Sequence, residues 1–261
     1  MEEELLKVGS HDDDRFDRSR RIPWLDMDKV SVARVLIVGA GALGNEVVKC
    51  LALSGVGAMS IVDMDHVVLS NLNRCLFFRS RDAQDRGMKA EIVAEGGREL
   101  YPDCDIRHFV GRVEDMPFAW EDHDVVLGCL DNVLARLYVN AHSYHHGIPY
   151  VDGGTDGFRG KVQVVLPPEG PCLQCGMNRS HQKILERRFS CTGSDISFFE
   201  RKMAAEITTT SIVAAMQSRE ALKIISGRSD MCIRNVCHYN GETGESMVLE
   251  LDVAAGCQNH L

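Results

Sequence analysis

The chain has 261 residues, 44% hydrophobic and 26% charged, so it can bury a full core and has the composition of a globular protein. Its net charge of −9 argues against nucleic acid as a partner, because a surface that follows phosphates needs an excess of Lys and Arg. No apolar run is long enough to span a bilayer, and the acidic start is not typical of a signal peptide, so we expect no membrane association. The ten cysteines indicate reduced thiols, a metal site and one reactive thiol, and we expect a cytoplasmic protein.

The first 30 residues are expected to form an N-terminal arm, and residues 31–261 a single domain. Residues 1–14 are polar and acidic, and we expect them to be mobile. An Arg-rich segment follows from Arg15. It is interpreted either as a surface helix that covers a sheet edge or as a functional arm, and both interpretations stay open.

The stretch from Arg34 to Asp65 predicts the mononucleotide-binding half of a doubly wound fold. An apolar run predicts a buried strand, which enters the pattern Gly39-x-Gly41-x-x-Gly44 and continues as a helix. The glycines permit a tight turn, let backbone N–H groups approach a phosphate, and allow close packing of helix on strand. A second apolar run ends on Asp63, which is placed to accept hydrogen bonds from ribose hydroxyls. The stretch therefore predicts nucleotide binding.

Two further segments place polar groups near this edge. Residues 70–74 contain Asn71 and Arg74 just beyond the second predicted strand, where doubly wound folds bind ligands. An amide and an Arg are suited to phosphate oxygens there, although the segment alone favours a capped loop with a surface Arg. Residues 81–100 show helical spacing with Lys89 near the beginning, although two adjacent glycines weaken that prediction.

Strands and helices alternate over the first 150 residues, which indicates an α/β protein with a Rossmann-like, doubly wound and mostly parallel sheet. Asp131 follows one of these strands and faces the same crevice as Asp63. The remaining elements of this part are expected as a strand at 105–110, a strand at 125–129, a helix at 133–146 and a strand at 148–151.

From residue 158 the pattern changes to an alternating strand, and we expect an antiparallel extension of the sheet. Residues 182–203 are charged and irregular. The longest amphipathic helix is predicted over 204–227, where it ends at a glycine. A hairpin is predicted over 234–253.

The polar residues at the strand ends suit attack of a carboxylate on the α-phosphorus of ATP. Asp63 offers a ribose acceptor, and Asp131 offers a carboxylate suited to Mg²⁺. Asn71, Arg74 and Lys89 offer donors to phosphate oxygens. An ionised carboxylate needs no general base, so the reaction depends on positioning and on positive charge near the transition state.

Several motifs, in order along nearly the whole chain, resemble the ubiquitin-activating-enzyme superfamily, which includes the ThiF/MoeB-type sulfur-carrier adenylyltransferases and the activating enzymes for ubiquitin-like proteins. These motifs are GAGALG, DMDHVVLSNLNR, GMKAE, CLDN, DGGTDGFRGKVQVVLP and PCLQC. The resemblance implies that Asp131 binds Mg²⁺ and is catalytic together with Arg74 and Lys89. The ATP-binding residues that it implies are Gly41, with Gly39 and Gly44 of the same turn, Asp63, Asn71, Arg74 and Lys89.

The resemblance also concerns the N-terminal segment, where in this superfamily an Arg reaches into the active site of the partner subunit. Arg18 is the candidate here. It implies a dimer, either a homodimer or a pseudo-symmetric heterodimer.

A structural zinc site is implied in the C-terminal part. In the superfamily a CxxC and a second ligand pair after the terminal strand bind zinc. This chain has Cys172 and Cys175 and then Cys257-x-x-His260, and three thiolates with one imidazole are an acceptable zinc-ligand set. Cys232 and Cys237 are a competing pair, or else core residues.

Cys191 matches, by position and by its Cys-Thr context, the cysteine that accepts the acyl group as a thioester in activating enzymes. Neighbouring arginines, or a helix N-terminus, would lower its pKa. The alternative is an inert loop cysteine. We expect this protein to lack the large catalytic-cysteine domain and the C-terminal ubiquitin-fold domain of the biggest superfamily members. We therefore expect a compact form in which a mobile loop at about 178–203 carries Cys191 to the adenylate.

The predicted function is ATP-dependent activation of a ubiquitin-like β-grasp protein, by adenylation of its C-terminal glycine and thioester transfer to Cys191, with a conjugating enzyme as a possible further partner. The alternative is a sulfur-carrier adenylyltransferase without an obligatory thioester. A non-catalytic scaffold subunit is disfavoured because the phosphate-binding residues are present. An NAD-dependent oxidoreductase is suggested only by the glycine turn.

Overall fold

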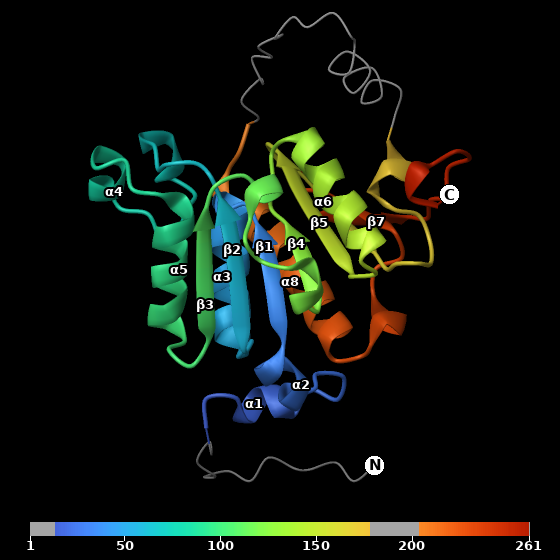
Figure 1. Ribbon diagram of the computed structural model, residues 1–261, viewed down its shortest axis with the longest axis horizontal. Helices are drawn as coiled ribbons and strands as arrows, with labels where there is room; N and C mark the ends of the chain where they lie inside the picture. Colours follow the sequence, from blue (N-terminus) through green and yellow to red (C-terminus); the bar gives the residue numbers. More distant parts are fainter. Residues whose placement is uncertain (1–13, 178–203, 261) are drawn as a thin grey trace, which may run out of the picture.

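The computed structural model describes residues 14–177 and 204–260. Residues 1–13 and residues 178–203, with Cys191, lie outside the described residues. One eight-stranded sheet runs through the described part, with the strand order β3-β2-β1-β4-β5-β6-β7-β8 (Figure 1).

The first five strands in this order are mutually parallel, and β6, β7 and β8 continue the sheet in antiparallel pairs. The predicted fold class is thereby confirmed: a doubly wound, mostly parallel sheet with an antiparallel C-terminal extension. The strands are β1 (Arg34–Val38), β2 (Ala58–Asp63), β3 (Asp105–Val110), β4 (Val125–Gly128), β5 (Tyr150–Asp156), β6 (Arg159–Val165), β7 (Val236–Asn240) and β8 (Glu245–Leu249).

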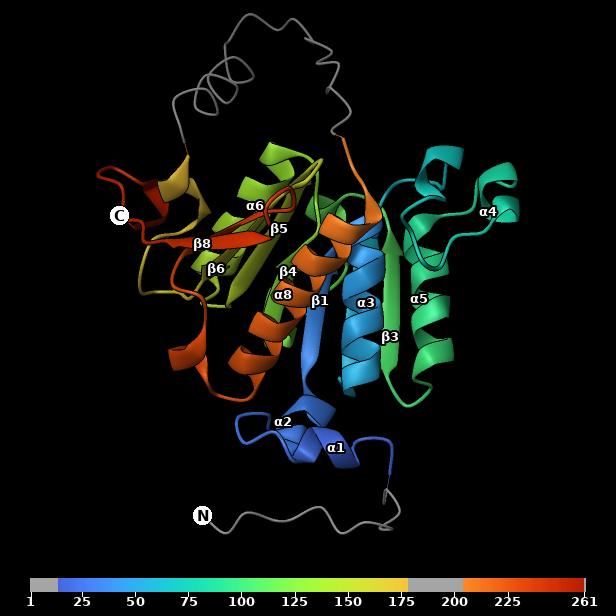
Figure 2. The ribbon, with the colours of Figure 1, turned by 180° about the vertical axis from the view of Figure 1, so that it is seen from behind.

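Helices cover both faces of the sheet, as Figures 1 and 2 show. Three pack on one face: α3 (Ala42–Ser54), α5 (Lys89–Leu100) and α8 (Ile207–Ile225). On the other face lies α6 (Val133–His145). Because successive strand residues point to opposite faces, Val35 and Ile37 of β1 enter the core under α3, whereas Leu36 and Val38 enter the core on the α6 side.

The single helix predicted over 81–100 is wrong in one respect, because the structure divides it into α4 (Ser80–Gln84) and α5. Arg86 interrupts the helix with a φ of 54°, a left-handed conformation. The glycines that weakened the prediction lie inside α5. A Cβ at Gly97 would lie 2.7 Å from the Ile106 side chain, so this glycine lets α5 approach β3 closely.

The Arg-rich segment lies at the amino-terminal ends of the strands, where α1 (Asp17–Arg20) and α2 (Met27–Val32) form a cap (Figure 1). Met27 and Val30 of α2 are buried in the core. The Phe16 ring, just before α1, packs edge to face on Tyr101 at the end of α5. Within the two described ranges, we find no helix with the length and apolar character that crossing a membrane requires.

A buried amide joins α8 to the centre of the sheet. Nε2 of Gln217 donates to the carbonyl of Gly128 at 3.0 Å and to that of Val151 at 3.1 Å, and the side chain is fully buried. A Cβ at Gly153 would lie only 2.1 Å from Oε1 of Gln217. The glycine at 153 therefore makes room for the amide that ties β4 to β5.

We expect Gly153→Ala to lower the free energy of unfolding by about 1–3 kcal/mol, because the added methyl overpacks the Gln217 amide. Gln217→Ala alone should also be destabilising, since it removes two hydrogen bonds of a buried amide and leaves a cavity. The double substitution should lower the free energy of unfolding by less than the sum of the two single losses, because the methyl added at position 153 no longer meets the Gln217 amide. Urea unfolding of the three variants measures this, and additive losses would contradict the clash.

Candidate functional site

The three glycines of the turn between β1 and α3 have different surroundings. Gly39 has a φ of +101°, and a Cβ there would lie 2.4 Å from the carbonyl oxygen of Cys129. A Cβ at Gly44 would lie 2.1 Å from the carbonyl oxygen of Gly39. At Gly41, by contrast, no atom lies within 4 Å of an added Cβ. Gly39 and Gly44 are therefore required by packing, whereas the open space at Gly41 is where a ligand can approach the backbone.

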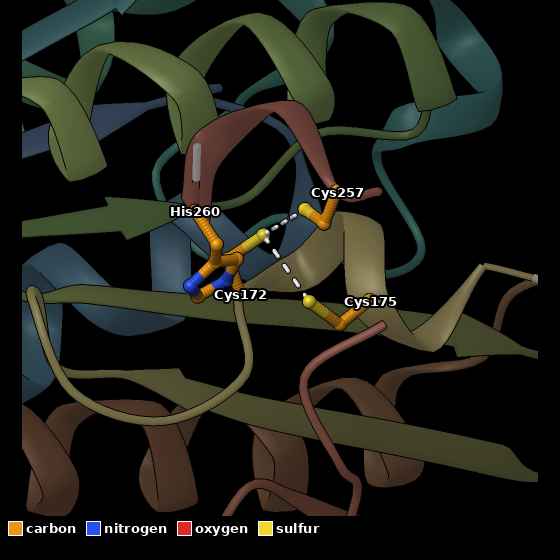
Figure 3. Close-up of side chains that lie close together, drawn as sticks. All are labelled: Cys172, Cys175, Cys257 and His260. Atoms are coloured by element: carbon orange, nitrogen blue, oxygen red, sulfur yellow. Dashed lines mark hydrogen bonds between the residues drawn. The ribbon is translucent and has the colours of Figure 1, made fainter. Parts of the chain in front are cut away.

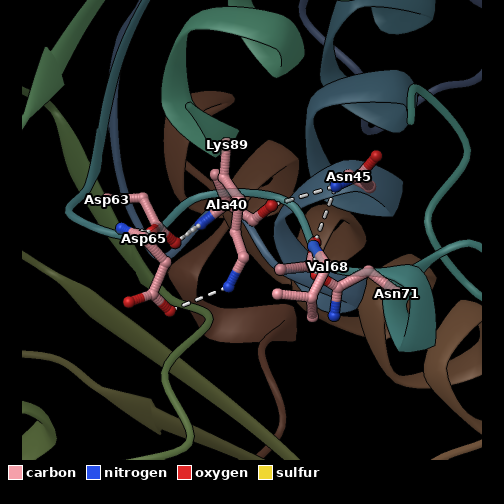
Figure 4. Close-up of polar contacts among 8 residues, drawn as sticks. Ala40, Asn45, Asp63, Asp65, Val68, Asn71 and Lys89 are labelled. Carbon is pink, nitrogen blue, oxygen red and sulfur yellow. Dashed lines mark hydrogen bonds and ion pairs between the residues drawn. The ribbon is translucent and has the colours of Figure 1, made fainter. Parts of the chain in front are cut away.

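Asp63 ends β2 and holds the glycine turn in place. Its carboxylate accepts hydrogen bonds from the backbone N–H of Ala40 at 2.7 Å and of Asp65 at 2.8 Å (Figure 4). Burial raises the pKa of Asp63, and the nearby Lys89 charge and these two hydrogen bonds oppose the rise. The predicted ribose acceptor thus also organises the loop. Its contact with a ribose stays a prediction.

Lys89 is the first residue of α5, and its ammonium group pairs with the carboxylate of Asp65 at 2.8 Å (Figure 4). The Lys89 side chain is only 12% exposed, whereas that of Asp65 is 56% exposed. The backbone N–H of Lys89 also donates to the carbonyl of Asp65 at 3.0 Å. Lys89 is therefore held at the carboxyl end of β2, beside Asp63, as the sequence predicted. Asp65 was not singled out from the sequence.

Asn71 and Arg74 form the capped loop that the segment by itself favoured. Asn71 is buried in a short 3₁₀ helix, η1 (Leu69–Asn71), and its Oδ1 accepts from the N–H of Val68 at 3.1 Å (Figure 4). The Arg74 guanidinium bends back to donate to the carbonyl of Ser70 and, at 3.0 Å, to Oδ1 of Asn73. Phosphate binding by either side chain stays a prediction.

Asn45 connects this loop to the glycine turn, and the sequence analysis missed it. Its side chain is fully buried, and Nδ2 donates to the carbonyls of Ala40 at 3.0 Å and Gly41 at 2.9 Å. Its Oδ1 accepts from the N–H of Phe77 at 3.0 Å. A polar residue directly after the third glycine, on a side of α3 that is otherwise apolar, was the available signal.

Asp131 lies three residues beyond β4, at the same edge of the sheet. Its side chain is exposed, and its carboxylate has no hydrogen bond or ion pair with any residue in the described ranges. Asn132 next to it accepts from the N–H of Leu134 at 2.8 Å and so begins α6. An exposed carboxylate without a protein partner fits a Mg²⁺ ligand.

A buried ion pair holds the turn that carries Asp131 in place. The sequence analysis missed this pair. The Arg136 guanidinium donates to the carbonyl of Leu130 and pairs with the carboxylate of Asp152 at 2.7 Å. Asp152 is fully buried, and its other oxygen accepts from the Tyr150 hydroxyl at 2.8 Å. The carbonyl that precedes Asp131 is thereby fixed to β5.

Arg18 lies at the other end of the molecule from this crevice. It is part of α1, which packs near the carboxyl ends of α3 and α5, whereas the glycine turn is at the amino end of α3. The 13 residues of α3 span about 20 Å. The structure therefore does not bring Arg18 to the crevice of its own chain, and a role in a partner's crevice stays a prediction.

The structure brings the four predicted metal ligands together (Figure 3). The ligand atoms of Cys172, Cys175, Cys257 and His260 all lie within 4.8 Å of one another. The sulfur of Cys172 is 3.9 Å from that of Cys175 and 3.6 Å from that of Cys257. A tetrahedral ion with metal–sulfur bonds of about 2.3 Å separates its sulfur ligands by about 3.8 Å, so the spacing fits zinc.

One thiol of this cluster is prepared for ionisation. Burial opposes ionisation of Cys172, but hydrogen bonds, the largest contribution coming from the Asn259 amide, lower its pKa to about 7. That amide nitrogen lies 3.3 Å from the sulfur. The competing pair does not join the cluster. Cys232 is buried against the carbonyl of Glu220, and Cys237 is buried within β7.

The different surroundings of two glycines generate a prediction. We expect Gly41→Ala to keep the stability of the fold and to weaken ATP binding, because its methyl group enters the space left open for a ligand. Gly44→Ala should instead lower the free energy of unfolding by about 1–3 kcal/mol, because its methyl group meets the backbone of Gly39. Thermal unfolding and calorimetric ATP titration of both variants measure this, and loss of fold in Gly41→Ala would contradict it.

Comparisons with known proteins agree with this geometry. The model of the ThiF family matches residues 16–259. A NEDD8-activating enzyme E1 catalytic subunit from Arabidopsis thaliana is 35% identical over an alignment of 167 residues, which covers 59% of this chain and 36% of that protein. A ubiquitin-activating enzyme E1-like protein from Saccharomyces cerevisiae is 34% identical over 56% of this chain and 23% of that protein. This chain thus spans about a third or less of these two relatives.

Among solved structures, a crystal structure of E. coli MccB with succinimide matches with a TM-score of 0.76 over 94% of this chain and 74% of that chain, at 19% identity. A structure of E. coli MccB with ATP matches with a TM-score of 0.71 at 20% identity, over 89% of this chain and 68% of that chain. These two similarities concern the fold. The family match over residues 16–259, nearly the whole chain, shows that the protein belongs to the ThiF family.

Proposed function

We propose that this protein is an ATP-dependent activating enzyme for a ubiquitin-like protein. The observation that carries the proposal is the edge formed by the carboxyl ends of β1, β2 and β4, which places an open glycine backbone, a held lysine and an exposed carboxylate after neighbouring strands. The relatives named as activating enzymes for NEDD8 and as E1-like support the same class of reaction. Its location in the cytoplasm stays a prediction from composition.

The first step is adenylation. The C-terminal glycine carboxylate attacks the α-phosphorus of ATP, the bond from that phosphorus to the bridging oxygen breaks, and pyrophosphate leaves. Lys89, Asn71 and Arg74 orient the phosphates and offset their charge, and Asp63 receives the ribose. Asp131 would hold Mg²⁺, which supplies further positive charge to the phosphate oxygens when bound.

The second step transfers the acyl group. The thiolate of Cys191 attacks the carbonyl carbon of the adenylate, a thioester forms, and AMP leaves. Cys191 lies outside the described residues, so its role rests on its position in the sequence and on the resemblance. A sulfur-carrier adenylyltransferase, the alternative, would stop at the adenylate or pass it to a sulfur donor. The presence of an enzyme-bound thioester separates the two.

The position of Arg18 favours a role in the active site of a partner subunit within a dimer. Because α1 lies at the opposite end of the strands from its own crevice, an Arg on this helix has to act in a partner's crevice if it takes part in the reaction. We propose a homodimer or a pseudo-symmetric heterodimer on this ground. The partner that brings the substrate is a β-grasp protein with a C-terminal glycine, and a conjugating enzyme would receive the thioester.

The Cys172, Cys175, Cys257 and His260 cluster is proposed to bind a structural zinc ion. The cluster lies against the C-terminal end of α6, where Tyr144 touches His260, whereas Asp131 precedes the amino end of that helix. Asn132 and Tyr144 are about 18 Å apart along α6 at 1.5 Å per residue. That distance supports a structural role for the metal, away from the chemistry of ATP.

Substitutions should separate the two steps. With ubiquitin or NEDD8 as the trial substrate, we expect Asp131→Ala to abolish ATP–pyrophosphate exchange, because the Mg²⁺ ligand is lost. Cys191→Ala should keep exchange and lose only a reductant-labile adduct in the intact mass. Cys50→Ala, a free cysteine on α3, is the matched control and should keep both. Loss of exchange in Cys191→Ala would refute this division, and exchange without any adduct in the wild type would favour the sulfur-carrier alternative.

Metal removal should affect stability more than nucleotide binding. We expect chelation under reducing conditions to lower the melting temperature by several degrees, because a structural metal contributes folding energy, and to leave the Kd for ATP within about twofold. Metal analysis of the purified protein should give one zinc per chain. An equal loss of stability and ATP affinity would place the metal at the crevice instead.

A further inference from the structure

Tyr144 lies in the last turn of α6 and joins that helix to two other segments. Its hydroxyl oxygen is 2.7 Å from the backbone carbonyl oxygen of Pro168 and 2.9 Å from Nδ1 of His260. The Tyr144 and His260 rings also meet edge to face, with centroids 4.7 Å apart and an interplanar angle of 61°. Tyr144 therefore sets the position of the His260 ring through a polar and an apolar contact.

The Tyr144 hydroxyl can donate one hydrogen bond and has two polar neighbours. The chemistry of these neighbours decides to which of them the hydroxyl donates. A carbonyl oxygen can only accept, so the hydroxyl donates to Pro168. The hydroxyl oxygen then accepts a hydrogen bond from Nδ1–H of His260. A neutral imidazole that carries its proton on Nδ1 has its free lone pair on Nε2.

Nε2 of His260 is buried and has no hydrogen-bond partner among the residues that the structure describes. A buried polar atom left unpaired is costly unless something binds it, and the thiols of the cluster lie beside this ring (Figure 3). We infer that Tyr144 is a positioning residue: it holds the Nδ1–H form of His260 and directs Nε2 to a tetrahedral metal ion. This inference rests on the zinc site proposed above.

The same face of α6 also contacts the CxxC loop, which supplies Cys172 and Cys175. Asn140, one turn before Tyr144, is fully buried, and its Oδ1 accepts from the N–H of Leu173 at 2.9 Å. Leu173 lies between the two cysteines of the CxxC. One helix therefore positions the loop with Cys172 and the histidine ligand that comes from the end of the described chain. Both segments that supply metal ligands are thus held by the same helix.

Tyr144→Phe tests the inference because it removes the hydroxyl and keeps the ring. We expect the affinity for Zn²⁺, measured by competition with a chelator, to fall about 10- to 100-fold. The Co²⁺-loaded variant should keep a tetrahedral absorption spectrum. Tyr138→Phe is the matched control on the same helix, since the Tyr138 hydroxyl has no hydrogen bond to any described residue, and it should bind Zn²⁺ like the wild type. Unchanged affinity in Tyr144→Phe would overturn the inference.

His260→Cys gives a second test, because a thiolate has no second nitrogen for Tyr144 to hold. In the His260→Cys background, Tyr144→Phe should leave Zn²⁺ affinity unchanged, so the two substitutions are coupled. An equal loss in both backgrounds would overturn the inference, because Tyr144 would then act on the fold in general. A wild-type protein that binds neither Zn²⁺ nor Co²⁺ would overturn the metal site itself, and the inference with it.

Discussion

The turn between β1 and α3 passes between the carboxyl ends of β2 and β4, the two strands that flank β1. Its close contact with both strand ends determines the geometry of the site. The N–H of Gly39 donates to the carbonyl of Val62 in β2, and the N–H of Cys129 donates to that of Val38 in β1, both at 2.8 Å. Gly39 tolerates no side chain, because its φ is +101° and the carbonyl oxygen of Cys129 would lie 2.4 Å from a Cβ. Because the turn cannot shift, α3 begins at a fixed place, and the residues that follow β2 and β4 face it from either side.

Asp63 and Asp131 lie at the strand ends beside this turn. Their surroundings differ, and so does the ability of each carboxylate to bind a cation. Asp63 is largely enclosed and accepts two backbone N–H groups, so its charge is already used to hold the turn, and burial raises its pKa. Asp131 is exposed, and the described residues leave its oxygens without a partner. A carboxylate that stabilises a loop and one that stays available for a cation can therefore coexist at one strand edge, because Arg136 and Asp152 support the Asp131 turn through its backbone and not through its side chain.

The order of strands and helices and the glycine turn could be predicted from the sequence, because periodicity and turn residues are local signals. The four clustered metal ligands came instead from the resemblance to the superfamily, because the two ligand pairs lie far apart in the chain. The interruption of the helix over 81–100 could not, since it depends on the left-handed conformation that Arg86 adopts. The contacts of Asn45, Asp65 and Tyr144 were also missed. Each of them joins segments that are far apart or separated by a turn. The sequence alone does not show which group a polar side chain will contact, because the fold determines that. The crevice residues were found by their position after strands, but which of them already have protein partners is visible only in the structure.

The metal cluster can matter to the crevice without taking part in its chemistry. It joins residues 172–175 to residues 257–260, two segments separated by β7, β8 and α8, so an ion bound there would close a long loop and restrict the unfolded chain. The same cluster is fastened to α6 through Asn140 and Tyr144, and α6 begins directly after the turn that displays Asp131. The helix α6 is therefore held at both ends, by Arg136 near the Asp131 turn and by the contacts of Asn140 and Tyr144 with the cluster.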